Sequence, residues 1–268
     1  MNISMKTIVF TDLDGTFLNH NNYSFAESKE ALEQLFNKEI PLIFTTSKTK
    51  IEVELLQKKV GIQEPFIVEN GAALFIPKNY KGFDFSFLEN VDEYYVLQLG
   101  ISYKKVLDFY DSFKEEFQMF GFSDMTDEDV AKQTGLSLEN ARLSKKRDFT
   151  EPILLKDELQ LEKLQKKAIR HGIKITKGGR FYHLIGEAQD KGVAVSMCIQ
   201  LFEEVYKTKI KSIGLGDGQN DVALLENVAV PIAIQNHKGD YISITTHKLQ
   251  KSSFKGAKGW NEMILKNV

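Results

Sequence analysis

The chain has 268 residues and a formal net charge of −2, and hydrophobic residues make up 42% of it, enough for a sizeable core. Its lone Cys198 excludes a disulfide framework and a cysteine-rich zinc site, and it fits a reducing cytoplasm. Neither nucleic-acid nor membrane binding is expected, because there is no basic excess and no apolar run approaches the roughly 18–20 residues that span a bilayer.

Strand and helix patterns alternate in the first part of the chain. Short β-rich apolar runs are separated by segments with apolar residues at helical spacing, such as Ala31, Leu32 and Leu35. The predicted order is strand 7–10, helix 24–37, strand 41–46, helix 49–60 and strand 65–68. Strands that read as continuous apolar runs are buried on both faces, so this order predicts an α/β fold with a doubly wound parallel sheet.

The last part of the chain repeats the alternation, so both ends are predicted to form one sheet. Its elements are helix 191–206, strand 210–215, helix 220–227, strand 230–234 and helix 259–267. The middle is mixed, with strand 94–99, helix 103–118, a polar helical stretch 126–147, strand 152–155, helix 157–171 and strands 173–176 and 181–185. We therefore predict a core made of 1–82 and 189–268, and an inserted α+β cap domain at 83–188.

Two acidic residues follow the first predicted strand, in the segment Asp12-Leu13-Asp14-Gly15-Thr16. Side chains two residues apart on a strand point the same way, so the carboxylates of Asp12 and Asp14 converge at the strand's carboxyl end, where α/β sheets bind ligands. Two like charges this close repel each other unless they share a cation or a proton. The pattern therefore predicts a site for a divalent cation such as Mg²⁺.

A second acidic cluster follows the strand at 210–215, in the segment Gly216-Asp217-Gly218-Gln219-Asn220-Asp221. Asp217 and Asp221 are four residues apart at a loop-to-helix junction, so both can face a metal ion. The dinucleotide fingerprint G-x-G-x-x-G fails here, because its last glycine is replaced by Gln219. The two acidic clusters together indicate one metal site.

These segments resemble the motifs of the haloacid dehalogenase (HAD) superfamily of aspartate-dependent phosphohydrolases, and they occur in the same order. They are Asp12-x-Asp14-x-Thr16, then Thr46, then Lys191, and finally Gly216-Asp217-x-x-x-Asp221. The resemblance implies that Asp12 attacks phosphorus and forms an aspartyl-phosphate, while Asp14 protonates the leaving oxygen and then activates water. It also implies that Thr46 donates to a phosphoryl oxygen and that Lys191 brings positive charge to the phosphate and Asp12.

The same resemblance implies Mg²⁺ as the cofactor. Asp12, Asp217 and the backbone carbonyl of Asp14 would hold it, with Asp221 and Asn220 fixing the surrounding shell. The physics agrees with this assignment, because a carboxylate can attack a phosphate only where a metal ion and a lysine screen their mutual repulsion.

Three further segments are similar to the mannosyl-3-phosphoglycerate phosphatases of the type IIB (Cof-like) subgroup, whose long insertion forms a lid. They are Thr46-Ser47-Lys48-Thr49, Arg147-Asp148-Phe149-Thr150-Glu151-Pro152 and Lys177-Gly178-Gly179-Arg180-Phe181-Tyr182-His183. Such a substrate carries a phosphate, a carboxylate and sugar hydroxyls, and guanidinium groups suit the carboxylate. The candidate substrate-binding residues are Glu69, Asn70, Arg142, Arg147, Glu151, Arg180 and His183.

Simpler interpretations of these segments stay open. A lid arginine can serve surface solubility, and residues 142–148 are rich in charge. His183 alternates with Phe181 and Ile185, which is also the pattern of a packed core imidazole. Gly178-Gly179 predicts a hairpin turn.

The resemblance implies a Mg²⁺-dependent phosphomonoesterase that hydrolyses mannosyl-3-phosphoglycerate to mannosylglycerate and phosphate, in compatible-solute synthesis. Glucosyl-3-phosphoglycerate and other sugar phosphates are alternative substrates, because a pocket separates epimers only if it hydrogen-bonds the differing hydroxyl. A phosphomutase of the superfamily would share the core motifs. A non-catalytic phospho-ligand sensor would be expected to lack Asp12 or Asp14, yet both are present. The sequence favours no particular oligomeric state.

Overall fold

Strands from both ends of the chain form one large sheet in this computed structural model, which describes residues 5–178, 180–244 and 248–268. Its described strands are β1 (Lys6–Thr11), β2 (Leu42–Thr45), β3 (Phe66–Val68), β4 (Ala73–Pro77), β5 (Glu89–Val91), β6 (Tyr94–Gln98), β11 (Ile210–Gly216), β12 (Val230–Gln235) and β13 (Gln250–Lys255). They follow the order β13-β12-β11-β1-β2-β3-β4-β6-β5. The strands from β13 to β3 are parallel, and β4, β6 and β5 continue the sheet antiparallel.

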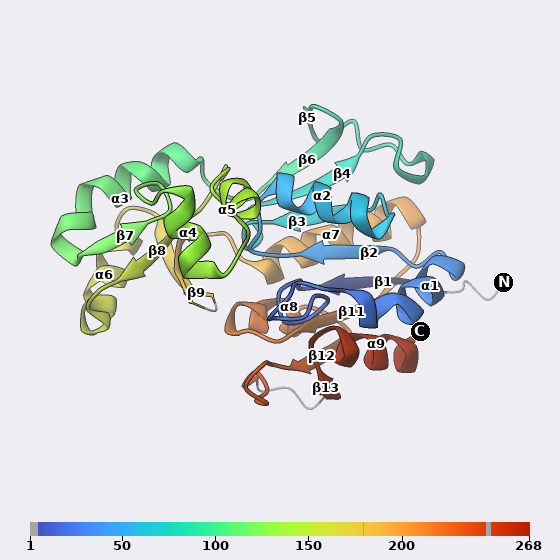
Figure 1. Cartoon of the computed structure of the whole chain (residues 1–268). Helices are drawn as coiled ribbons and strands as arrows, with labels where there is room; N and C mark the ends of the chain where they lie inside the picture. The colour runs from blue at the N-terminus through green and yellow to red at the C-terminus, as the bar shows by residue number, and fades with distance from the viewer. Residues whose placement is uncertain (1–4, 179, 245–247) are drawn as a thin grey trace.

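Helices cover both faces of this sheet (Figure 1). They are α1 (Lys29–Asn37), α2 (Lys50–Val60), α7 (Lys191–Tyr206), α8 (Val222–Glu226) and α9 (Gly256–Asn267), with 3₁₀ turns η1 (Ala26–Ser28), η2 (Tyr80–Gly82) and η4 (Gln219–Asp221). Within β1, Val9 packs on one face with Leu35 and Trp260. Its neighbour Phe10 packs on the other face with Phe202. Two apolar layers on one strand confirm the predicted doubly wound sheet.

A second, antiparallel sheet has the order β7-β8-β10-β9 and lies at one end of the large sheet (Figure 1). Its strands are β7 (Met119–Gly121), β8 (Glu151–Leu155), β9 (Ile173–Lys177) and β10 (Tyr182–Gly186). The associated helices are α3 (Tyr103–Phe117), α4 (Asp127–Thr134), α5 (Leu138–Ser144) and α6 (Leu161–Ile169), with the turn η3 (Glu158–Gln160). We call residues 103–186 the cap and the large sheet with its helices the core.

Two expectations for the middle of the chain were wrong. The strand predicted at 94–99 forms as β6, but it pairs with β4 in the large sheet, with Ala73 opposite Gln98 and Pro77 opposite Tyr94. The prediction missed β4, a fully buried strand that pairs antiparallel with β3 on one side and with β6 on the other. The helical stretch predicted at 126–147 is two helices, because Gly135 ends α4 in a left-handed conformation.

Among the described residues, no helix is long and apolar enough to cross a membrane.

Candidate active site

Three parallel strands end at the same edge of the large sheet and bring the predicted motifs together. Asp12 follows β1, Thr46 follows β2 and Asp217 follows β11, and these strands are neighbours in the order β11-β1-β2. Gly15 turns the chain after Asp14 with a φ of 85°, and a Cβ placed on it would lie 2.5 Å from Asp217 Oδ2. Glycine is therefore required where the first acidic segment passes the second.

Lys191 joins two of the acidic residues at the base of the site. Its Nζ lies 2.5 Å from Asp12 Oδ1 and 2.6 Å from Asp221 Oδ1, and the lysine side chain has no exposed surface. Burial lowers the pKa of Lys191, but the attraction of Asp12 and Asp221 outweighs it, so the net effect raises the pKa. Lys191 therefore stays charged and fixes one oxygen of Asp12.

The acidic cluster of Asp12, Asp217 and Asp221 has the composition of a metal site. One carboxylate oxygen from each residue lies within 4.8 Å of the others. Burial, followed by the charge of Asp221, raises the pKa of Asp12 to about 7. Burial, followed by the charge of Asp12, also raises the pKa of Asp217. Buried carboxylates that repel one another gain from a hard cation, so this cluster could bind a metal ion.

Asp221 differs from the other two acids because both of its oxygens already have partners. Oδ1 faces Lys191, and Oδ2 accepts hydrogen bonds from the backbone N–H groups of Asp217 (3.1 Å) and Gly218 (3.0 Å). Thr16 Oγ1 donates to Asp217 Oδ1 at 2.9 Å. Asp221 therefore fixes the backbone that carries Asp217, and Thr16 holds one oxygen of the Asp217 carboxylate.

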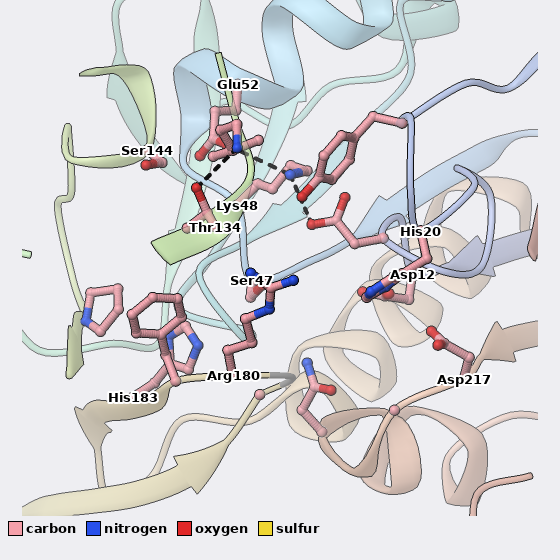
Figure 2. A pocket seen from close by; sticks show the side chains of 18 of the residues that line it. Asp12, His20, Ser47, Lys48, Glu52, Thr134, Ser144, Arg180, His183 and Asp217 are labelled. Carbon is pink, nitrogen blue, oxygen red and sulfur yellow. Dashed lines mark hydrogen bonds and ion pairs between the residues drawn. The ribbon is translucent and has the colours of Figure 1, made fainter. Parts of the chain in front are cut away.

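Asp14 pairs with a second lysine, Lys48. Its Oδ2 lies 2.8 Å from Lys48 Nζ, while its Oδ1 is buried and has no hydrogen-bond partner among the described residues. Lys48 also lies 3.7 Å from Glu52 (Figure 2) and 5.3 Å from the centre of the Tyr23 ring. Burial lowers the pKa of Lys48, but Asp14 and Glu52 outweigh it and raise the pKa overall. Asp14 is thus held by a permanent positive charge.

Thr46 is buried behind the cavity wall. Its Oγ1 accepts a hydrogen bond from the backbone N–H of Lys48 at 3.2 Å, and its carbonyl accepts one from Asn70 at 2.9 Å. Ser47, the next residue, lines the cavity, and Thr46 does not. In this conformation Thr46 shapes the loop after β2.

A cavity of about 300 Å³ lies between the cap and the edge of the core that carries Asp12 and Asp217. Its core wall includes Asp12, Asp14, Ser47, Lys48, Asp217 and Asn220. Its cap wall includes Phe122, Leu136, Arg147, Pro152, Arg180 and His183. Figure 2 shows Asp12 and Asp217 on one side, His183 on the other, and Arg180 between them. A molecule whose phosphate lies at the acidic cluster can therefore touch the cap.

Three of the predicted substrate-binding residues line this cavity. Arg147 is 9% exposed, and its guanidinium donates to the carbonyls of Ser47 and Ser144. Arg180 donates to the carbonyl of Gln133 at 2.6 Å. His183 is 7% exposed, and its Nδ1 has no hydrogen-bond partner among the described residues. Burial, followed by the charges of Arg147 and Lys191, lowers the pKa of His183 to about 3, so its imidazole is neutral.

The other predicted substrate-binding residues do not line the cavity. Arg142 is mostly exposed and pairs with Asp127 at the surface. The Glu151 carboxylate is buried inside the cap, where it accepts hydrogen bonds from Ser123 and Tyr103.

Glu69 and Asn70 lie behind the core wall. The Glu69 carboxylate accepts hydrogen bonds from cap residues 148–150, and Asn70 Oδ1 accepts one from Asn220 at 3.2 Å. Gly179, half of the predicted hairpin pair, lies outside the described residues.

Several cavity residues were missed by the sequence reasoning. Lys48 stands in a segment that was singled out, although no role was given to it, and Glu52 follows it by one helical turn. Tyr23, His20 and His237 belong to loops without a motif, and the two imidazole rings stack with centroids 3.9 Å apart. Only the folded chain brings these two loops together.

Known proteins resemble this chain along nearly its whole length. The sequence profile of the haloacid dehalogenase-like hydrolases matches residues 9–257. A glucosyl-3-phosphoglycerate/mannosyl-3-phosphoglycerate phosphatase from Persephonella marina is 48% identical over 96% of this chain and 95% of its own. A protein of the same name from Methanococcoides burtonii is 37% identical over 97% of each chain. A mannosyl-3-phosphoglycerate phosphatase from Pyrococcus furiosus is 34% identical over 84% of this chain and 89% of its own.

Solved structures share the fold at lower identity. A haloacid dehalogenase-like hydrolase from B. subtilis gives a TM-score of 0.67 at 17% identity and covers 98% of this chain and 100% of its own. The sucrose-phosphatase of Synechocystis, solved with sucrose and phosphate, gives a TM-score of 0.62 at 14% identity and covers 98% of each chain. The profile match and the full-length relatives show that this chain belongs to the haloacid dehalogenase-like hydrolases.

Proposed function

We propose that this protein is a phosphomonoesterase that converts mannosyl-3-phosphoglycerate or glucosyl-3-phosphoglycerate to the glycosylglycerate and phosphate. One observation carries the chemistry, namely the buried Lys191 that joins Asp12 to Asp221 beside a cavity of about 300 Å³. The substrate class is supported by the relatives, because the 48% identical protein is named for both compounds.

The chain's own residues account for the two chemical steps. A carboxylate oxygen of Asp12 attacks phosphorus, and the bond from phosphorus to the glycerate oxygen breaks as Asp14 gives that oxygen a proton. Asp14 then takes a proton from water, which attacks the aspartyl-phosphate, releases phosphate and restores Asp12. Lys191 offsets the repulsion between the Asp12 carboxylate and the phosphate in the first step, and the negative charge that returns to Asp12 as the aspartyl-phosphate is hydrolysed in the second.

We propose Mg²⁺ as the cation of the acidic cluster. Asp12, Asp217 and the carbonyl of Asp14 would hold it, and Asp221 and Asn220 would orient these groups. When bound, the ion would screen the phosphate from the attacking carboxylate. Burial, followed by the charges of neighbouring aspartates, raises the pKa of both Asp12 and Asp217, which supports this assignment.

The cap wall supplies groups that suit the rest of the substrate. Arg180 has a backbone carbonyl as its described partner, so we propose that it pairs with the glycerate carboxylate. His183 offers a neutral imidazole whose Nδ1 has no hydrogen-bond partner among the described residues, which suits a sugar hydroxyl. Arg147 already donates to two carbonyls and would add positive charge near the same carboxylate.

We propose that the core and the cap are two domains, as expected from the sequence. The predicted boundaries were 1–82 with 189–268, and 83–188. Because β5 and β6 belong to the large sheet, the first boundary is better placed after Gln98. The single buried thiol of Cys198 supports the cytoplasm as the proposed compartment.

A phosphate-release assay with Mg²⁺ tests this function. Mannosyl- and glucosyl-3-phosphoglycerate should be turned over with higher kcat/KM than 3-phosphoglycerate, mannose 6-phosphate or glucose 6-phosphate. Preference for a simple hexose phosphate would refute the substrate assignment. Turnover that needs a bisphosphate activator and releases no free phosphate would instead establish a phosphomutase.

A further inference from the structure

Glu69 connects the core to the cap through a carboxylate with no exposed surface. Its Oε1 accepts a hydrogen bond from the backbone N–H of Asp148 at 2.9 Å. Its Oε2 accepts one from the N–H of Phe149 at 3.2 Å and one from Thr150 Oγ1 at 2.7 Å. Glu69 follows β3 in the core, whereas the three donors precede β8 in the cap. One core carboxylate therefore accepts hydrogen bonds from three consecutive cap residues.

The main chain of Glu69 is tied to the catalytic loops on its other side. Its N–H donates to the carbonyl of Lys48 at 3.0 Å, in the loop that holds Asp14. Its carbonyl accepts a hydrogen bond from Gln189 Nε2 at 2.6 Å, two residues before Lys191. The position of the cap is thus linked through one residue to both lysines of the site.

The backbone at Glu69 and Asn70 adopts the left-handed conformation, which is unfavourable for residues that carry a side chain. Glu69 and Asn70 have φ values of 47° and 60°, and Gly71 follows with 88°. A Cβ on Gly71 would lie 2.1 Å from the carbonyl oxygen of Asp190, so this turn presses directly on the segment before Lys191. Consecutive left-handed residues with side chains are strained and persist where surrounding contacts hold them.

Arg147 makes a second contact between the cap and the core beside Glu69. Its Nη1 donates to Ser47 O at 2.9 Å in the core and to Thr150 Oγ1 at 3.2 Å in the cap. The same atom lies 4.0 Å from Glu69 Oε2, so it offsets the buried negative charge. Arg147, Asp148, Phe149 and Thr150 thus each donate a hydrogen bond from the cap to the core.

We propose that Glu69 and residues 147–150 form a latch that holds the cap closed and thereby sets the preference for a large glycosylated substrate. Glu69 is a positioning residue, because it does not line the cavity. The inference rests on the proposed function. Closure brings Arg180 and His183 against the part of the substrate beyond the phosphate, whereas phosphoryl transfer at Asp12 uses core residues alone.

The kinetic test compares two substrates across three variants. Glu69→Gln and Thr150→Val each remove part of the latch. Glu64→Gln is the matched control, because Glu64 is a half-buried core carboxylate that accepts a hydrogen bond from Tyr80 and none from the described residues of the cap. In both latch variants kcat/KM for the glycosyl phosphoglycerate should fall about tenfold or more, while that for p-nitrophenyl phosphate should change less than about twofold. The control should leave the ratio unchanged.

Amide hydrogen exchange provides a readout that needs no substrate. The N–H groups of Asp148 and Phe149 donate to the Glu69 carboxylate, so they should exchange faster in Glu69→Gln, by about tenfold, than in the wild type or Glu64→Gln. Unchanged exchange at both amides, or an equal loss of kcat/KM on both substrates, would overturn the latch. If the wild type hydrolyses no glycosyl phosphoglycerate, the proposed function fails, and the exchange rates alone decide on the latch.

Discussion

Lys48 Nζ lies 2.8 Å from Asp14 Oδ2, so the proposed general acid of this enzyme is paired with a lysine of the loop after β2. The pair fixes the direction of the Asp14 carboxylate. In a family where this aspartate exchanges protons with the leaving group and with water, its orientation determines the rate of both transfers.

Replacement of Lys48 by methionine should lower kcat by about tenfold or more. The loss should be smaller than the roughly 10²- to 10⁴-fold contribution of a general acid, because Asp14 itself remains. Lys48→Arg should restore part of the rate, since it keeps the charge. Steady-state kinetics separate the effects: a raised KM at unchanged kcat would mean that Lys48 binds substrate and does not position Asp14.

The Asp12→Asn variant should lose at least about 10³-fold in kcat, because the amide is a poor nucleophile toward phosphorus. A phosphoenzyme trapped by acid quench in the wild type should be absent from the variant. Asp84→Asn, at an exposed aspartate of the core, is the control and should retain full activity. Substantial turnover by Asp12→Asn would contradict covalent catalysis at this residue.

Removal of divalent cations should destabilise the fold as well as abolish activity. Burial, followed by the charges of neighbouring aspartates, raises the pKa of Asp12 and of Asp217, and bound Mg²⁺ would offset these buried negative charges. The ion should stabilise the native state by about 2.7 kcal/mol once free Mg²⁺ reaches roughly 100 times its Kd. Thermal unfolding after chelation, followed by Mg²⁺ titration, measures this as a rise in Tm. Asp217→Asn should reduce the rise, and an equal rise in that variant would place the ion elsewhere.

His183 should make the protein less stable in acid. Burial lowers the pKa of its imidazole from 6.5 to about 3, so below pH 6.5 the unfolded chain binds a proton that the native state does not. Between pH 6.5 and about 3 this group should lower the unfolding free energy by about 1.4 kcal/mol for each unit that the pH falls. Denaturant titrations at pH 7 and pH 5 should show a shallower decline for His183→Phe. If the unfolding free energy of the wild type and of His183→Phe fell equally between pH 7 and pH 5, His183 would take up its proton in the folded protein as well.

Two arginines provide a matched comparison of the substrate assignment. Arg180→Ala should raise KM for the glycosyl phosphoglycerate by about tenfold, since it removes the proposed partner of the glycerate carboxylate. Arg142→Ala should leave KM unchanged, because that side chain pairs with Asp127 at the surface of the cap. A similar rise in KM in both variants would result from the change in net charge, and it would contradict the proposed contact between Arg180 and the substrate.

The sequence predicts that Asp12 and Asp217 meet at one edge of the sheet, because the signal for each position is local. Asp12 and Asp217 each follow a short apolar strand, and a parallel sheet brings the ends of such strands together whatever the rest of the chain does. The alternation of apolar runs and helical segments likewise predicts the doubly wound core. The strand β13 was missed because it is a polar edge strand, in which only Ser252 is buried.

The cap residues were harder to predict because their partners are distant in the sequence. The Glu69 carboxylate and the Thr150 hydroxyl are 81 positions apart, and no pattern along the chain shows that they meet. Resemblance placed Arg147 and Glu151 in a substrate-binding segment, yet Glu151 bonds inside the cap and Arg147 bonds across to the core as well as lining the cavity. The direction of a buried polar side chain is decided by which segments pack together, and only the folded chain provides that.

The pairing of β1 with β11 affects the order in which the protein can fold during its synthesis. Thr16 and Asp217 are hydrogen-bonded across 201 positions, and β1 pairs with β11 on one side, so the first strand leaves the ribosome long before this neighbour. The cap sheet is assembled from strands of one continuous stretch, and such contacts close sooner. We therefore expect the cap to fold on the nascent chain first, and the catalytic centre to form only after the last quarter of the chain has emerged.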